Sequence, residues 1–188
     1  MRDSRRRRAG IGNLNARGGI ALDRRRFLAV ALGVFLWRLP GAVRAAALAD
    51  DTRRALESSR FVYVSPLRGD GSESSCHGEV WYGWLDGAVV VIVSSDSWKA
   101  RAVARGLDRA RIWVGDFGRV KGLLWSNEAF REGPHFETRA AAVQDAALLE
   151  RLLSGYERKY PEEIDRWRER MREGYRDGSR ILLRYRPV

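Results

Sequence analysis

The sequence predicts a mainly β fold with α-helices, of the α+β class, for the part of the chain after residue 49. Three observations predict it. Six short runs are rich in β-branched and aromatic residues, the pair Asp86-Gly87 joins two of them as in a tight hairpin, and the C-terminal third carries apolar residues at helical spacing. The expected strands span residues 61–64, 79–84, 88–93, 111–115, 136–140 and 181–185.

The first 49 residues have the composition of an export signal. Eleven arginines precede residue 50, against two acidic residues. An uncharged run of eleven residues follows at 27–37, shorter than the about 20 apolar residues that a transmembrane helix needs. Pro40-Gly41 then breaks the helix, and Ala47-Leu48-Ala49 offers the small residues of a cleavage site. We therefore expect a signal peptide over 1–49, a mature domain over 50–188, and no stable membrane anchor after cleavage.

Residues 23–28, with the sequence Asp-Arg-Arg-Arg-Phe-Leu, resemble the twin-arginine consensus S/T-R-R-x-F-L-K. Asp23 stands in place of Ser or Thr, and Ala29 in place of Lys. The resemblance implies that the twin-arginine translocase exports the protein to the periplasm or another extracytoplasmic space. The alternative is a basic tail that binds nucleic acid or anionic lipid, but such a tail would need neither the apolar run nor the Ala-x-Ala ending.

Removing the leader changes the charge of the chain. The whole chain has 35 basic and 24 acidic side chains, of which 24 and 22 follow residue 49, a net charge of +2. The basic excess therefore belongs to the leader, and we expect no nucleic-acid partner. The remaining 139 residues suit one domain with one core. The single cysteine, Cys76, excludes an intrachain disulfide, and with only two histidines we expect no metal site.

The mature domain begins with a short helix at 51–58, and its first strand ends at Ser65-Pro66. A polar, glycine-containing turn at 68–72 leads towards the second strand. The third strand, 88–93, is apolar at every position. A strand without polar alternation is typical of one that is covered on both faces, so we expect this strand to lie deep in the domain.

A serine-rich cluster at 94–97 precedes a run of helix formers at 98–105, and Gly106 follows. Serine or aspartate before such a run and glycine after it are typical of the two ends of a helix. Residues 116–133 are long for a plain loop, and we expect them to form a flap. The C-terminal helices have apolar stripes, the first of which includes Leu149, Leu152 and Leu153, and the second Ile164, Trp167, Met171 and Tyr175.

This order of elements resembles the pyridoxamine 5'-phosphate oxidase-like family of FMN-binding split β-barrels. The resemblance covers residues 60–118 and the last strand. It depends on the turn Asp70-Gly71 before an aromatic second strand, on Ser97-Trp98-Lys99 after the third strand, and on a helix that leads into residues 109–112. It implies a six-stranded antiparallel split β-barrel with a short crossover helix and C-terminal helices. It also implies a homodimer with the flavin between its subunits and a flavin-dependent oxidoreductase activity.

The candidate phosphate site is the segment that follows the third strand. Ser94, Ser95 and Ser97 offer hydroxyls, Lys99 offers an ammonium, and a helix N-terminus presents free N–H groups, which together suit the phosphate of FMN. Asp96 would compete with a phosphate unless its carboxylate points away. The alternative is that the serines only cap the helix and that Lys99 is solvated.

The resemblance also implies candidates for the flavin ring, namely His77, Trp81, Tyr82 and Trp98. His77 and Tyr82 stand where the oxidases have an Arg and a Lys, and Trp98 stands in place of a second basic residue. Pyridoxamine phosphate is therefore a poor candidate substrate, because less charge is available for its phosphate. His77 could donate a hydrogen bond or a proton to a flavin, or it could be a histidine of an exposed turn. The tryptophans could stack on the flavin or simply belong to the core.

Three functions stay open at this point. The first is an exported FMN-dependent oxidoreductase whose substrate and catalytic residues the sequence does not reveal. The second is a non-catalytic split barrel, or one that carries deazaflavin F420 or haem. The third is a cofactor-free structural domain of the cell envelope. Fold by itself does not decide among them.

Overall fold

The computed structural model describes residues 48–117 and 128–188, all of which belong to one compact unit, Gly41–Val188. The predicted signal sequence up to residue 47, and residues 118–127 of the predicted flap, lie outside the described residues. The described elements are, in chain order, α1 (Asp50–Ser58), β1 (Val62–Pro66), β2 (Gly78–Val80), β3 (Gly83–Leu85), β4 (Ala88–Ser94), α2 (Trp98–Ala104), β5 (Arg109–Val114), η1 (Ala129–Glu132), β6 (His135–Val143), α3 (Ala146–Lys159), α4 (Ile164–Asp177) and β7 (Arg180–Pro187).

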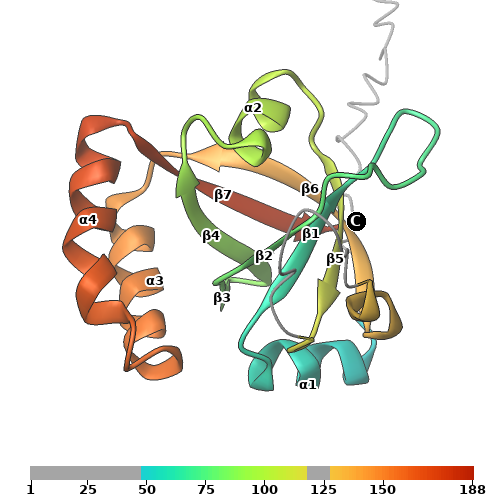
Figure 1. The fold of residues 1–188 in the computed structure, drawn as a ribbon, viewed down its shortest axis with the longest axis horizontal. Coiled ribbons are helices and arrows are strands. Elements are labelled where there is room, and N and C mark those ends of the chain that lie inside the picture. Colours follow the sequence, from blue (N-terminus) through green and yellow to red (C-terminus); the bar gives the residue numbers. More distant parts are fainter. Residues whose placement is uncertain (1–47, 118–127) are drawn as a thin grey trace, which may run out of the picture. The chain divides into compact units, whose positions relative to one another are not determined.

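The strands form one curved sheet in which every described pair is antiparallel. Their order is β2-β1-β5-β6-β7-β4-β3. β2 and β3 are thus the two edges of the sheet, yet only Trp81 and Tyr82 separate them along the chain. The sheet must therefore bend round until its two edges meet at this corner, as the ribbon in Figure 1 illustrates. The predicted α+β class and the antiparallel pairing are confirmed.

The prediction of six strands is wrong, because the expected second strand is divided in two. Its first half pairs with β1, with Val62 opposite Val80, and its second half pairs with β4, with Gly83 opposite Val90. At the corner between them, the backbone forms hydrogen bonds with two tyrosine side chains, one in α3 and one in the residue that directly follows α3. The hydroxyl of Tyr156 donates to Trp81 O at 2.8 Å, and Tyr82 N donates to the hydroxyl of Tyr160 at 3.3 Å. These bonds replace ladder bonds, so the chain can change partner strand here.

The Asp-Gly hairpin and the doubly covered strand are both confirmed. Asp86 and Gly87 have φ values of 52° and 69°, the left-handed conformations that a two-residue hairpin of the primed type requires. Along β4, Val89, Val91 and Val93 face the inside of the curved sheet, whereas Val90 and Ile92 face the helices α3 and α4.

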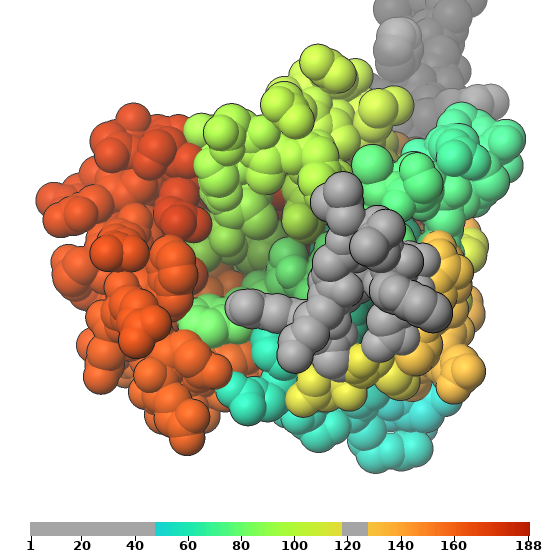
Figure 2. All heavy atoms as spheres, viewed as in Figure 1, coloured from blue at the N-terminus to red at the C-terminus, as the bar shows by residue number. Residues whose placement is uncertain are grey.

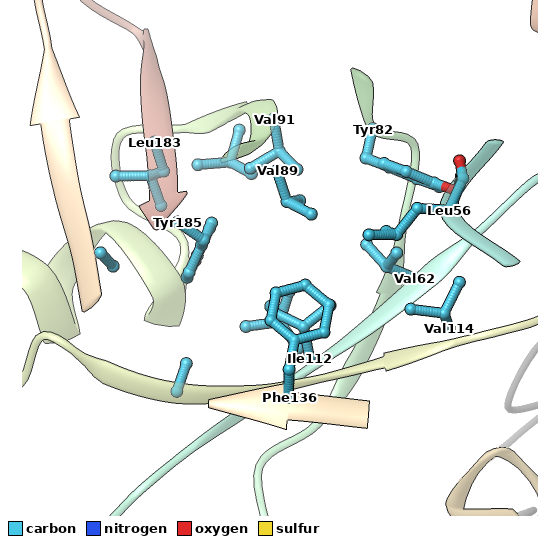
Figure 3. Close-up of a cluster of buried hydrophobic side chains, with 14 of the residues drawn as sticks. Leu56, Val62, Tyr82, Val89, Val91, Ile112, Val114, Phe136, Leu183 and Tyr185 are labelled. Carbon is cyan, nitrogen blue, oxygen red and sulfur yellow. Dashed lines mark hydrogen bonds between the residues drawn. The ribbon is translucent and has the colours of Figure 1, made fainter. Parts of the chain in front are cut away.

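The buried apolar side chains of the described residues form three clusters. An inner cluster fills the curved sheet, and Figure 3 shows its side chains converging from opposite strands, among them Val62, Val91, Phe136 and Tyr185. An outer cluster lies between the sheet and the two C-terminal helices, where Leu152 and Leu153 are fully buried. A small third cluster joins Tyr63, Trp113 and Phe130 under η1. Within the described ranges, no helix combines the length and the apolar character that crossing a bilayer would require.

Candidate functional site

The serine-rich turn lies between β4 and α2, as the sequence predicts. Ser97 is the N-cap of α2, because its Oγ accepts a hydrogen bond from Ala100 N at 3.3 Å. The hydroxyl of Ser94 donates to Asp96 Oδ1. The hydroxyl of Ser95 donates to Ser179 O at 3.1 Å. The hydroxyl protons of Ser94 and Ser95 are therefore engaged, whereas no described residue accepts the hydroxyl proton of Ser97.

Lys99 lies against strand β2 rather than in solvent. Its Nζ is 4.3 Å from the ring centroid of Trp98, and a Cβ added to Gly78 would lie 3.2 Å from it. No described residue forms a hydrogen bond or an ion pair with this ammonium group, and burial lowers the pKa of Lys99. An unpaired and desolvated ammonium is stabilised by any anion that reaches it.

The space directly beside Lys99 is too small for a phosphate. The hollow that Lys99 lines together with Trp98 has a volume of about 10 Å³, which is room for one water molecule.

A larger hollow of about 280 Å³ opens nearby, lined by Val80, Trp81, Ile92, Tyr156, Trp167, Met171 and Arg180. Val80 and Gly78 lie on the same face of β2, since side chains two apart in a strand point the same way. Arg180 stands opposite Ser94 in the β4–β7 ladder, so this hollow begins next to the serine-rich turn.

A second hollow of about 510 Å³ adjoins the first, and Trp81 and Trp167 line both. We call the two together the aromatic groove. Trp81 is held in place by Tyr160, whose ring lies parallel to it at a centroid distance of 4.3 Å. In the space-filling view of Figure 2, the surface is hollowed between the orange residues of the C-terminal helices and the green residues of the middle of the chain.

The two ends of the aromatic groove differ in charge. The first hollow has one cation, Arg180, for which the structure shows no ion pair among the described residues. The second hollow holds Glu79, Glu162, Glu163 and Arg166, and Glu163 is paired with Arg60 at 3.2 Å. An anionic group in the groove would therefore lie at the Arg180 end, where it meets a positive charge.

The predicted site residues outside the serine-rich turn lie in different parts of the structure. Trp81 lines the groove, while Trp98 and Lys99 contact Gly78 beside it. His77 lies elsewhere, with its ring 5.0 Å from that of Phe130, and its buried Nδ1 has no hydrogen-bond partner among the described residues. Tyr82 is fully buried in the inner cluster, where its hydroxyl lies 2.7 Å from Leu56 O and 3.1 Å from Ser59 O.

The groove also contains residues that the sequence reasoning did not select. Trp167 and Met171 belong to the second helical stripe, which the sequence indicates only as a buried face, and Arg180 is the first residue of the last strand. Spacing along one helix does not reveal that its apolar face is incompletely covered. In the described parts of the chain, no three His, Cys, Asp or Glu side chains gather as they would around a metal ion.

No protein-family model and no curated protein matches this sequence. Among solved structures, the chain is similar to HutZ, the haem storage protein of Vibrio cholerae, with 12% identity over 75% of this chain and 90% of that one, at a TM-score of 0.49. A conserved hypothetical protein of Mycobacterium tuberculosis shares 21% identity over 73% and 79% of the two chains, also at 0.49.

A candidate pyridoxamine 5'-phosphate oxidase of Listeria innocua shares 11% identity over 73% of this chain and 91% of its own, at a TM-score of 0.45. All three likenesses have TM-scores below 0.5 and identities of 21% or less. They transfer no ligand and no activity to this chain, whose function is therefore inferred from its own residues.

Proposed function

We propose that this protein is an exported, FMN-dependent oxidoreductase that binds its cofactor in the aromatic groove. One observation carries the proposal. The aromatic groove, in which the ring of Tyr160 holds that of Trp81, ends at Arg180, next to the serine-rich turn and Lys99. Arg180 has no ion pair among the described residues. Ligand sites are typically hollows of about 300 to 1,000 Å³ with mostly apolar walls and a few polar groups. The two adjoining hollows, of about 280 and 510 Å³, are of this kind.

The residues of the groove fit a flat, anionic cofactor. Trp81 and Trp167 would hold the ring system, because aromatic faces favour stacked or edge contacts with a flat ring. Arg180 would hold the phosphate, with the free hydroxyl of Ser97 as a nearby donor. Lys99 would join them only if its side chain turned from Gly78 towards the groove. The proposed site does not include Ser94 and Ser95, because their hydroxyls already donate hydrogen bonds within the protein. It also does not include His77 and Tyr82, because these side chains face other clusters.

A bound flavin would supply hydride or electron transfer, and the protein would supply binding and orientation. The chain's own contribution is positional. The contact between Trp81 and Tyr160 fixes one wall, the apolar side chains of Ile92 and Met171 exclude water, and the acidic far end discourages the reverse orientation of an anionic ligand. Deazaflavin F420 and haem are also flat and anionic, so the shape and charge of the groove do not discriminate between them and FMN. The absorption spectrum of protein purified from its native host makes that distinction.

The proposal is tested by titrating FMN and riboflavin into the mature protein while tryptophan fluorescence is recorded. A hydrogen bond to a charged group contributes about 1.5 to 3 kcal/mol, so Arg180→Met is expected to weaken FMN binding about 10- to 150-fold. The matched control is Arg186→Met, since Arg186 is exposed on the same strand. Riboflavin lacks the phosphate and should bind to wild type and Arg180→Met alike. Unchanged FMN affinity in Arg180→Met would contradict the site.

Two further parts of the proposal rest on the sequence. Export is supported by the arginine pair, the apolar run and the Ala-x-Ala ending of residues 1–49. A homodimer is supported by the resemblance described above, in which the cofactor lies between two subunits.

A further inference from the structure

A third hollow, separate from the aromatic groove, lies where α1 and the end of α3 meet the strand corner. Its volume is about 370 Å³, and its apolar walls include Leu56, Tyr82 and Trp84. Gly155 of α3 also lines it, and a Cβ added at this position would meet no atom within 4 Å. A larger side chain at this position would therefore have room to extend into the hollow.

Lys159 ends α3 and lines this hollow. Its Nζ lies 3.4 Å from the ring centroid of Tyr82. The ring cannot move away, since Tyr82 is fully buried and its hydroxyl is held near two backbone carbonyl groups. The Lys159 amine therefore has a defined position at the wall of an open space.

The charged groups around the Lys159 amine leave it without a partner. Glu57 of α1 and Arg158 of α3 also line the hollow, but neither pairs with Lys159, which has no ion pair or hydrogen bond within residues 48–117 and 128–188. Burial lowers the pKa of Lys159 to about 7, and the ring face of Tyr82 acts in the opposite direction by attracting the ammonium form. A lysine that loses its proton near neutral pH is a nucleophile.

We propose that Lys159 is a nucleophilic amine that forms an imine with a hydrophobic aldehyde bound in this hollow. The lone pair of the neutral Nζ forms a bond to the carbonyl carbon. The carbonyl oxygen then leaves as water together with the two protons of the amine, and a carbon–nitrogen double bond remains. The walls of Leu56, Tyr82 and Trp84 favour an apolar aldehyde. This site uses no residue of the aromatic groove.

The test is to treat the protein with benzaldehyde and sodium cyanoborohydride, which reduces the imine to a stable amine, and to locate the label by peptide mass spectrometry. The chain has only three lysines, Lys99, Lys121 and Lys159, so each is distinguished directly. An amine with a pKa near 7 is about half neutral at pH 7, against about one part in 2,500 for an ordinary lysine. Burial also lowers the pKa of Lys99, so we expect only about ten-fold more label on Lys159 than on Lys99, with a rate that levels off above pH 7.

Two substitutions at Gly155 separate the hollow from the amine. Gly155→Leu fills the hollow and should reduce labelling of Lys159 about ten-fold or more, while Gly155→Ala leaves room and should keep it. Lys159→Arg should remove the label, and circular dichroism checks that each variant is folded. Equal labelling of Lys99 and Lys159, or unchanged labelling in folded Gly155→Leu, would overturn the proposal. FMN titration of Gly155→Leu reports on the aromatic groove independently.

Discussion

Replacing Glu73 with Gln is expected to destabilise the fold by about 2 kcal/mol, because this carboxylate connects three elements. Its side chain is 8% exposed. It accepts hydrogen bonds from Arg111 Nη1 of β5 at 2.9 Å, from Trp113 Nε1 at 3.4 Å, and from Arg131 of η1. Glu73 thus holds the loop after β1 against both β5 and the short helix that covers the third cluster.

The magnitude follows from the exposure of the partners. Two hydrogen bonds to charged groups would contribute about 1.5 to 3 kcal/mol each. Arg111 and Arg131 are 27% and 31% exposed, so water hydrates them when these bonds are lost, and the loss is smaller. A glutamine also still accepts one bond. These two effects bring the expected loss to about 2 kcal/mol, towards the lower end of the range for a single such bond.

The stabilisation that Glu73 contributes is expected to decrease as the pH falls. Burial raises the pKa of Glu73, but the hydrogen bonds and charge of Arg131, together with Arg111, outweigh it, so the net pKa lies below its ordinary value. A carboxyl whose pKa is lower in the folded state stabilises the fold fully above its unfolded pKa, about 4.3 for Glu. The contribution is lost as the pH falls through the lower, folded value.

The assay is urea unfolding at pH 7, monitored by tryptophan fluorescence. The midpoint urea concentrations are compared between variants whose free energy of unfolding has the same dependence on urea concentration. The matched control is Glu128→Gln, because Glu128 pairs with the same Arg131 at 3.1 Å but is 54% exposed. An exposed pair contributes about 0 to 1 kcal/mol. The difference between Glu73→Gln and wild type should shrink on acidification below the ordinary Glu range. Equal losses in the two variants at pH 7 would refute the reasoning.

Four further predictions concern packing, a helix end, export and assembly. Leu152→Ala should cost about 2 to 5 kcal/mol in urea unfolding, because the side chain of Leu152, in α3, is fully buried, whereas Leu107→Ala, at a position 56% exposed, should change little. Gly178→Ala should cost about 1 kcal/mol, because Gly178 ends α4 with φ 80°. Changing Arg24 and Arg25 to Lys should abolish export, and efficient delivery of that variant to the periplasm would count against the twin-arginine assignment. Light scattering of the cofactor-bound mature protein should give the mass of a dimer, and a monomer would contradict that proposal.

The local elements of this protein follow from its sequence because their causes are local. The Asp86-Gly87 pair suits the left-handed conformations of a tight hairpin, and an unbroken apolar run at 88–93 requires cover on both faces of a strand. Ser97 before α2 and the apolar stripes of α3 and α4 likewise specify helix ends and buried faces. Each of these signals acts between residues a few positions apart.

The candidate site could be predicted only in part, because its geometry depends on distant contacts. The sequence places Trp98 and Lys99 at the start of a helix after a strand, but it does not show that Lys99 lies against Gly78. It marks Trp81 as an aromatic of the second strand and Trp167 as part of a helical stripe. Only the packed structure brings these two tryptophans to the same groove.

The sequence by itself determined the class of fold, the order of the elements and the hairpin, since these depend on backbone preferences and short-range spacing. Only the tertiary structure decided that the second strand divides at Trp81 and Tyr82. The groups that make this possible, the hydroxyls of Tyr156 and Tyr160, are 75 and 78 residues away along the chain. A strand changes its partner when distant side chains satisfy its backbone, and no local propensity encodes that.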